Sequence, residues 1–239
     1  MKKLIAVFAL LFIASLSLSA DVYIKTKTHA DAMSMMGQNT PAKDGFSEQW
    51  LGDDLFANVS SDQSMIINLK KNMAWIVNHK AKTYVETPLP LDMSKLLPPE
   101  AAAFAGMMKM SVTVTESNET KKIGQWNCKL YNTAMSVMGM NVATKLWVSN
   151  DVGFDAAAFN SKFLGNIMKG GGMMLDDASV KEFAKIKGYQ IMTETEMFGA
   201  KTTTEVIEIS KKAPPAGIYA PPATGYTKTT SISMDALRK

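Results

Sequence analysis

The chain of 239 residues has a single cysteine, Cys128, and only two histidines, His29 and His79. One cysteine cannot form a disulfide within the chain, so no covalent bridge staples the fold. Zinc sites need several converging Cys, His or acidic ligands, and such a small supply of Cys and His argues against a metal centre. We therefore expect neither a metal nor a cofactor.

The cysteine lies in the run "WNCKL", where Trp126, Cys128 and Leu130 alternate as residues on one face of a strand do. We expect Cys128 to be a buried small hydrophobe, which is the usual state of a free cysteine. A reactive thiol or an intermolecular disulfide is the alternative.

The sequence also lacks the short motifs that accompany common catalytic chemistry. It has no Gly-x-Ser-x-Gly elbow, no His-Glu-x-x-His pair and no phosphate-binding loop. The acidic pairs Asp53-Asp54 and Asp176-Asp177 fall at a predicted turn and a predicted helix start, where acids are ordinarily solvated or capping. These absences favour a protein that is not an enzyme.

Long hydrophobic runs are missing beyond the N-terminus, so no membrane-spanning helix is expected. Residues 1–20 begin with two lysines, continue in an apolar run and end in "SLSA". This pattern predicts a signal peptide cleaved before Asp21, with cleavage after Ser19 as the alternative. We expect export to the periplasm, or secretion. The lysines of the remaining chain are scattered rather than clustered, so no nucleic-acid partner is expected.

The dominant period in residues 21–88 is two, which is the period of a β-strand. Runs rich in aromatic and β-branched residues recur about every nine residues and are separated by turn residues, as in "WLGDDLF" and "LKKNMAW". Residues 21–35 read as one long strand. Strands return at 109–150, with turns at "TESNET" and "VMGM", and again at 189–210.

Helical patterns interrupt the strands at four places. Asp92 caps a short predicted helix ending at Leu97, and a second helix runs from Pro99 to about Ala105. A third begins at Asp155 and continues to residue 169, and a fourth runs from Asp177 to Gly188. The pattern predicts one α+β domain over 21–239: a large, strongly curved antiparallel sheet, or open half-barrel, with a few helices covering its concave face. Residues 213–239 form a Pro-rich extension.

Methionine is abundant, with 19 in the chain, and it recurs before glycine in "AMSMMG" at 32–37, "AMSVMG" at 134–139 and "TEMFG" at 195–199. The last two are predicted hairpin tips, where apolar residues are unusual. Three interpretations stay open. Thioethers are soft ligands that select Cu(I); methionine fills gaps in cores; and an exposed methionine rim accepts variable apolar partners.

We take the third interpretation as the basis of a candidate site for an apolar ligand. Its predicted residues are Met33, Met35, Met36, Trp75, Met135, Met138, Met140, Trp147, Phe163, Met197 and Phe198.

Several runs carry a family resemblance: "YIKTKTHADAMSMMGQNTPAKDGFSEQWLGDD", "NHKAKTYVETPLPLD", "TKKIGQWNCKLYNTAMSVMGMNVATKLWVSNDVGFD" and "EISKKAPPAGIYAPPATGY". They resemble an exported bacterial family built on a domain of unknown function, within the lipoprotein-carrier (LolA-like) superfamily. The resemblance implies an open half-barrel closed by helices, with a hollow that binds acyl chains. The arginine that helps gate the lid of the carriers has no match, because the only arginine is Arg238.

Together, the residues and the resemblance predict a periplasmic, non-enzymatic protein that holds a lipid, acylated or other apolar ligand between sheet and helices. A module that docks an envelope protein through an exposed methionine rim is one alternative. Methionine-based copper binding is another.

Overall fold

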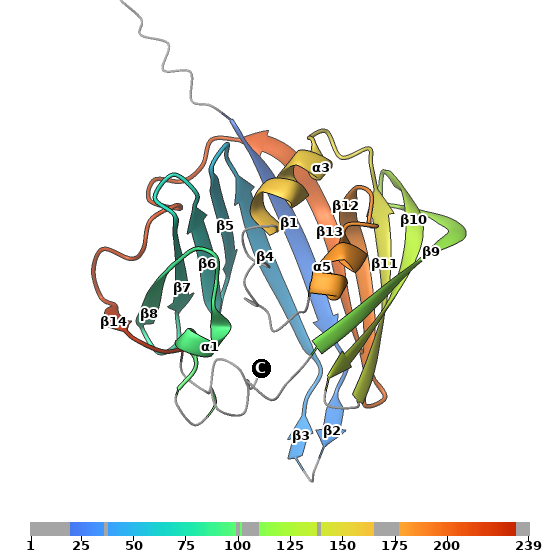
Figure 1. Cartoon of the computed structure of the whole chain (residues 1–239), viewed down its shortest axis with the longest axis horizontal. Helices are drawn as coiled ribbons and strands as arrows, with labels where there is room; N and C mark the ends of the chain where they lie inside the picture. The colour runs from blue at the N-terminus through green and yellow to red at the C-terminus, as the bar shows by residue number, and fades with distance from the viewer. Residues whose placement is uncertain are drawn as a thin grey trace, which may run out of the picture.

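The computed structural model describes residues 20–35, 38–98, 101, 110–137, 140–164 and 177–232. They form a broad sheet that carries a few short helices over one face (Figure 1). The sheet has twelve strands in the order β14-β8-β7-β6-β5-β4-β1-β13-β12-β11-β10-β9, and β2 and β3 make a separate two-stranded sheet. The predicted α+β class is confirmed. The sheet is mixed, because β14 joins β8 in parallel while the other pairs are antiparallel.

The strands are β1 (Asp21–Ala30), β2 (Met33–Met35), β3 (Gln38–Thr40), β4 (Lys43–Leu51), β5 (Leu55–Ser60), β6 (Gln63–Asn68), β7 (Met73–Asn78), β8 (Thr83–Pro88), β9 (Met110–Ile123), β10 (Trp126–Val137), β11 (Met140–Ser149), β12 (Tyr189–Met197), β13 (Ala200–Lys212) and β14 (Thr227–Thr229). The helical segments are α1 (Met93–Leu96), α3 (Ala156–Phe159), the π-helical turn η1 (Asn160–Leu164) and α5 (Asp177–Phe183).

The predicted meander of strands between residues 43 and 88 is confirmed. Strands β4 to β8 pair consecutively, and tight turns join them at the predicted places. Two of the turns contain residues with positive φ, Asn72 (φ 53) and Lys82 (φ 55). Strands β5, β6 and β7 are buried on both faces, since the neighbours Phe56-Ala57, Ile66-Ile67 and Ala74-Trp75 are all buried. Their aromatic and β-branched composition and the turn residues between them, rather than alternation, predict this part of the fold.

The single long strand predicted over residues 21–35 is wrong. Strand β1 ends at Ala30, and β2 belongs to a separate hairpin with β3. The break occurs at Asp31, whose backbone N–H donates to the carbonyl of Lys201 at 2.9 Å while its carboxylate accepts from the backbone N–H of Lys201 at 3.1 Å. These two bonds hold the end of β1 against the beginning of β13, and the chain leaves the large sheet there.

The predicted helices are present but short. Asp92 caps α1 by accepting a hydrogen bond from the backbone N–H of Ser94 at 3.2 Å, as expected. Asp155 caps α3 in the same way through Ala158, and the chain then continues as η1 rather than as regular α-helix. The helix predicted over 99–105 and the part predicted over 165–169 lie outside the described residues, apart from Ala101. In the part of the chain that the structure describes, no helix has the length and apolar character to cross a membrane.

The Pro-rich C-terminal extension packs against the half of the sheet that contains β4 to β8, at the left in Figure 1. Ile218, Tyr219 and Tyr226 contact a cluster formed by Tyr23, Trp50 and neighbouring buried residues. The chain then forms β14 beside β8, and Ile232 reaches the main core, where its N–H donates to the carbonyl of Leu96 at 2.7 Å. The extension therefore wraps around the β8 edge and covers backbone groups that an edge strand otherwise exposes.

A histidine holds this extension in place. The Nδ1 atom of His79 lies 2.8 Å from the hydroxyl of Tyr226, and its Nε2 atom lies 2.7 Å from Oγ of buried Ser64. Lys82 also donates to the Tyr226 hydroxyl, at 3.3 Å. Desolvation, and next the positive charge of Lys82, lower the pKa of His79, while Asp62 acts in the opposite direction.

We predict that this contact weakens in acid. Because the folded pKa of His79 lies below its unfolded value of about 6.5, its contribution to stability is present above that value and is lost as the pH falls through the folded pKa. Urea midpoints measured from pH 7.5 to 5 should fall for the wild type relative to His79→Gln. His29→Gln is the control with the opposite sign, because hydrogen bonding to Asp44 raises the pKa of His29. Parallel pH profiles for the wild type and His79→Gln would contradict the prediction.

Candidate functional site

Helices cover one face of the sheet, which we call the inner face. Its members follow from cross-strand pairing, since directly paired residues point to the same side. One row of paired residues runs Tyr131, Leu146, Thr193, Thr204 and Thr28 across five strands. Side chains of α5 pack on Tyr131 and Leu146 at one end of this row. Phe56 pairs with Leu51, which pairs with Val22 on the side of Ile24 and Thr28, and the ring of Phe56 lies 5.9 Å from Phe163 of η1. Both α5 and η1 therefore cover the same face.

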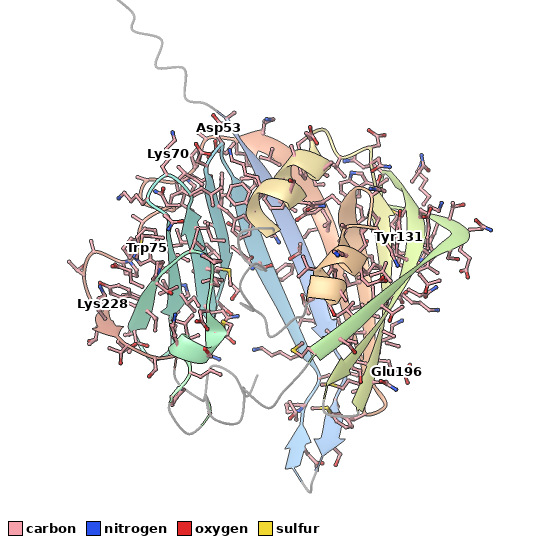
Figure 2. The ribbon with its side chains drawn as sticks, viewed as in Figure 1. Asp53, Lys70, Trp75, Tyr131, Glu196 and Lys228 are labelled. Atoms are coloured by element: carbon pink, nitrogen blue, oxygen red, sulfur yellow. The ribbon has the colours of Figure 1, made fainter. Side chains whose placement is uncertain are left out.

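The upper part of the inner face is apolar and closely packed. Phe56 lies 5.8 Å from the ring of Phe159 and 5.9 Å from the ring of Phe163. Val22, Ile24 and Ile67 surround these rings in the main core cluster. Lys162 fixes η1 to the β4–β5 turn, because its Nζ atom lies 2.6 Å from Oδ1 of Asp54 and donates to the carbonyl of Asp53. Figure 2 shows Asp53 at this end of the sheet. Phe163, a predicted site residue, is therefore buried core.

The central part of the inner face consists of hydroxyl side chains, which we call the hydroxyl patch. Its members are Thr26, Thr28, Ser47, Thr133, Thr144, Thr193, Thr195, Thr202 and Thr204. Three pairs are hydrogen bonded: Thr26 to Ser47 at 2.6 Å, Thr28 to Thr204 at 2.9 Å and Thr144 to Thr195 at 2.9 Å. Apart from buried Thr26, the members are half-buried. This group was not predicted from the sequence.

The amide side chains of Gln49 and Asn58 lie where the hydroxyl patch meets the apolar part of the inner face. Asn58 pairs with Gln49, which pairs with Ile24, so both amides are on the inner face. Oε1 of Gln49 accepts a hydrogen bond from the Tyr189 hydroxyl at 2.7 Å, and burial raises the pKa of Tyr189. Oδ1 of Asn58 is buried and has no hydrogen-bond partner. An unpaired buried acceptor is costly, so it favours any ligand that brings a donor to it.

The opposite face of the same strands is charged. His29 pairs with Asp44 at 2.8 Å, and Lys201 pairs with Glu194 at 2.5 Å. A shallow hollow of about 240 Å³ lies over β10 to β12, with Lys145, Glu194 and Lys201 among its lining residues. These ion pairs lie on the outer face, and no member of the hydroxyl patch carries a charge.

Two of the predicted methionine tips lie at the lower end of the sheet. The β2–β3 hairpin projects there in Figure 1, and Figure 2 places Glu196, just before the β12–β13 turn, at the same end. In that turn Met197 is 43% exposed and Phe198 is 54% exposed, with φ 52 at Phe198. Met33 is half-buried on β2.

Other predicted site residues are separated from these tips. Met135 packs in the cluster under α5, and Trp147 is buried in the main core with its indole N–H donating to Glu194 at 3.1 Å. Trp75 lies in the cluster beneath the C-terminal extension and donates to Glu86 at 3.0 Å. Met36 and Met138 lie outside the described residues, as do the side chains of Met35 and Met140.

Among residues whose placement is described, no three His, Cys, Asp or Glu side chains come together as potential metal ligands. Cys128 is free and buried, as expected, and burial raises the pKa of its thiol. A raised pKa keeps the thiol protonated and unreactive.

Comparisons with known proteins place the chain in a family. A search of curated proteins finds no match. Among solved structures, the chain is similar to PNGF-II, crystallised in space group C2, with a TM-score of 0.42 and 12% identity over 88% of this chain. The match covers 31% of that protein, so the chain spans about a third of its length. The model of a domain of unknown function, DUF4412, matches residues 55–226, and the chain therefore belongs to that family.

Proposed function

We propose that this protein is a non-enzymatic binding protein of the periplasm that holds a lipid, acylated or other apolar ligand between the inner face and the helices. The sheet would act as an open half-barrel of the LolA-like kind, a picture supported by the sequence resemblance only through analogy. The predicted signal peptide supports the location.

One observation carries the proposal. Half-buried apolar side chains border the packed core on the inner face: Met65 and Ile76 on the strands and Met93 on α1. Met110 and Met135 occupy the same position beside α5. These flexible side chains would become fully buried if an acyl chain lay against them, and each buried methylene stabilises binding by about 0.8 kcal/mol.

The short helices suit such a role. Segments α1, α3 with η1, and α5 are separate elements of four to nine residues, and each packs on a different part of the sheet. Short helices with few contacts open at low free energy compared with central strands. They can therefore admit a ligand without unfolding the sheet.

Mass spectrometry of organic extracts from the purified native protein tests the proposal. We expect an apolar molecule that co-purifies in about equimolar amount, and uptake of a fluorescent fatty acid after it is removed. Met65→Thr should weaken that uptake, whereas Met73→Thr on the opposite side of the meander should not. If no lipid co-purifies and no fatty acid is taken up, the proposal is refuted.

A second candidate function is docking of an envelope protein through the lower tips. The exposure of Met197 and Phe198 favours it, because turn tips are ordinarily polar. A partner that binds the wild type and is lost on Met197→Ser with Phe198→Ser, while lipid is absent, would favour this function instead.

A further inference from the structure

The hydroxyl patch indicates what kind of ligand the inner face accepts. We infer that the ligand is an amphiphile whose polar group is uncharged and rich in hydrogen-bonding atoms, such as a polyol, sugar or amide head, and that this group binds the hydroxyl patch while its acyl chain lies against the neighbouring apolar residues. The inference rests on the proposed function and specifies its ligand.

The first argument is the contrast between the two faces of the same strands. Thr28 and Thr204 face inward, while their neighbours His29, Thr203 and Glu205 face outward with the ion pairs of the region. A surface intended only for acyl chains would carry Val, Leu or Ile at the inward positions, because a hydroxyl costs free energy when an apolar group covers it. A surface intended for an anionic or cationic head would offer an unpaired opposite charge. Lys43, which the register places beside the patch, is already in an ion pair with Asp62 at 3.1 Å.

The second argument is the number of unused hydrogen-bonding positions. Each hydroxyl has one donor and two acceptor sites. A bonded pair such as Thr28 with Thr204 uses one donor and one acceptor, so one O–H group and several lone pairs remain. Thr193 and Thr202 form no side-chain hydrogen bond with the described part of the chain. The patch can therefore both donate to and accept from a ligand, as a neutral polyol or amide requires.

The third argument is the unpartnered Oδ1 atom of Asn58. It is buried at the boundary between the patch and the apolar residues Ile24, Phe56 and Met65. A neutral head group seated on the patch brings O–H or N–H donors to this boundary, and a carboxylate brings none. The acceptor is satisfied by the first kind of ligand and left unpaired by the second.

The position of the patch fits an amphiphile of this kind. Apolar residues border it on two sides: Ile24 and Phe56 under η1, and Tyr131 and Leu146 under α5. A chain extending from the patch in either direction reaches half-buried methionines, Met65 on one side and Met135 on the other. Head and tail sites are therefore continuous on one face.

Competition between two ligands of equal chain length tests the inference. The fluorescent fatty acid is displaced by 1-monolauroylglycerol or by laurate, each kept below its critical micelle concentration. We expect 1-monolauroylglycerol to displace it at about tenfold lower concentration than laurate, since one to two satisfied hydrogen bonds correspond to about that factor. Equal potency, or stronger displacement by laurate, overturns the inference and leaves the proposed function intact.

Isosteric variants locate the head group. Thr28→Val with Thr204→Val removes a bonded pair from the patch and should abolish the preference for monolauroylglycerol while laurate binding is retained or strengthened. Thr203→Val, on the outward side of the same strand, is the matched control and should keep the preference. If the first double variant fails to fold, Thr144→Val with Thr195→Val tests the same patch. A preference that survives these patch variants overturns the inference, and failure of both ligands to bind the wild type overturns the proposed function itself.

Discussion

Gly188→Ala should lower the free energy of unfolding by about 3–5 kcal/mol, more than the same substitution at any other glycine that the structure describes. Gly188 connects α5 to β12 with φ +113, a conformation that residues with a side chain rarely adopt. A Cβ atom there would lie 2.6 Å from the carbonyl oxygen of Ser149 and 2.5 Å from Oδ1 of Asn150. The side chain of Asn150 can move, but the backbone of β11 cannot without disturbing its pairing.

Variants of two other glycines distinguish backbone strain from steric overlap as the cause of this loss. Gly153 has φ +72 but open space around its Cβ position, so Gly153→Ala should cost only the backbone strain, about 1–2 kcal/mol. Gly45 has open space and no positive φ, so Gly45→Ala should change the free energy of unfolding by less than about 1 kcal/mol. Urea denaturation of the three variants measures the order. Equal losses for Gly188→Ala and Gly153→Ala would show that the close approach to Ser149 does not matter.

The position of Gly188 also shows what the sequence could and could not predict. Gly188 was expected to end the fourth helix, but α5 already ends at Phe183. Its contact with Ser149 is a matter of pairing between β11 and β12, which are separated in the chain by α3, η1 and α5. The same limit explains the error at Asp31. Its partner, Lys201, lies 170 residues further along the chain.

The hydroxyl patch had a sequence signal that was not recognised. Thr-x-Thr occurs as Thr26/Thr28, Thr193/Thr195 and Thr202/Thr204, in three strands that prove to be adjacent. The alternation alone was insufficient, because Thr113/Thr115 on β9 has the same spacing and its two residues are exposed. Spacing tells which residues share a side of their own strand, and only the register tells which strands bring those sides together.

The sequence predicted where the methionine-containing turns lie, but not whether their side chains are packed or exposed. Glycine placed the turns at Phe198-Gly199 and between β10 and β11 correctly. Whether Met135, Met33 and Met197 are packed or exposed depends on which helix covers each hairpin, and only Met135 lies beneath one. The similar motifs "AMSMMG" and "AMSVMG" therefore occupy different surroundings, which argues against a shared chemical role.

Phe163→Ala should cost about 3–5 kcal/mol, the usual range for removing a fully buried phenylalanine. Phe163 is 2% exposed, and its ring lies 5.2 Å from Phe159 and 5.9 Å from Phe56. Its removal leaves a cavity between η1 and the inner face, and η1 has only five residues with which to hold its place. Phe198→Ala is the matched control: the same atoms are removed at a turn where the ring is 54% exposed, so the change should stay within about 0.5 kcal/mol.

Two further variants make this prediction specific to packing. Phe163→Leu retains most of the buried volume and should recover more than half of the loss. Phe198→Gly should stabilise the protein by up to about 1 kcal/mol, because φ 52 at this position favours glycine over any residue with a Cβ atom. Thermal and urea unfolding of the four variants measures these values. A small effect of Phe163→Ala would show that η1 is not held to the sheet by its aromatic contacts.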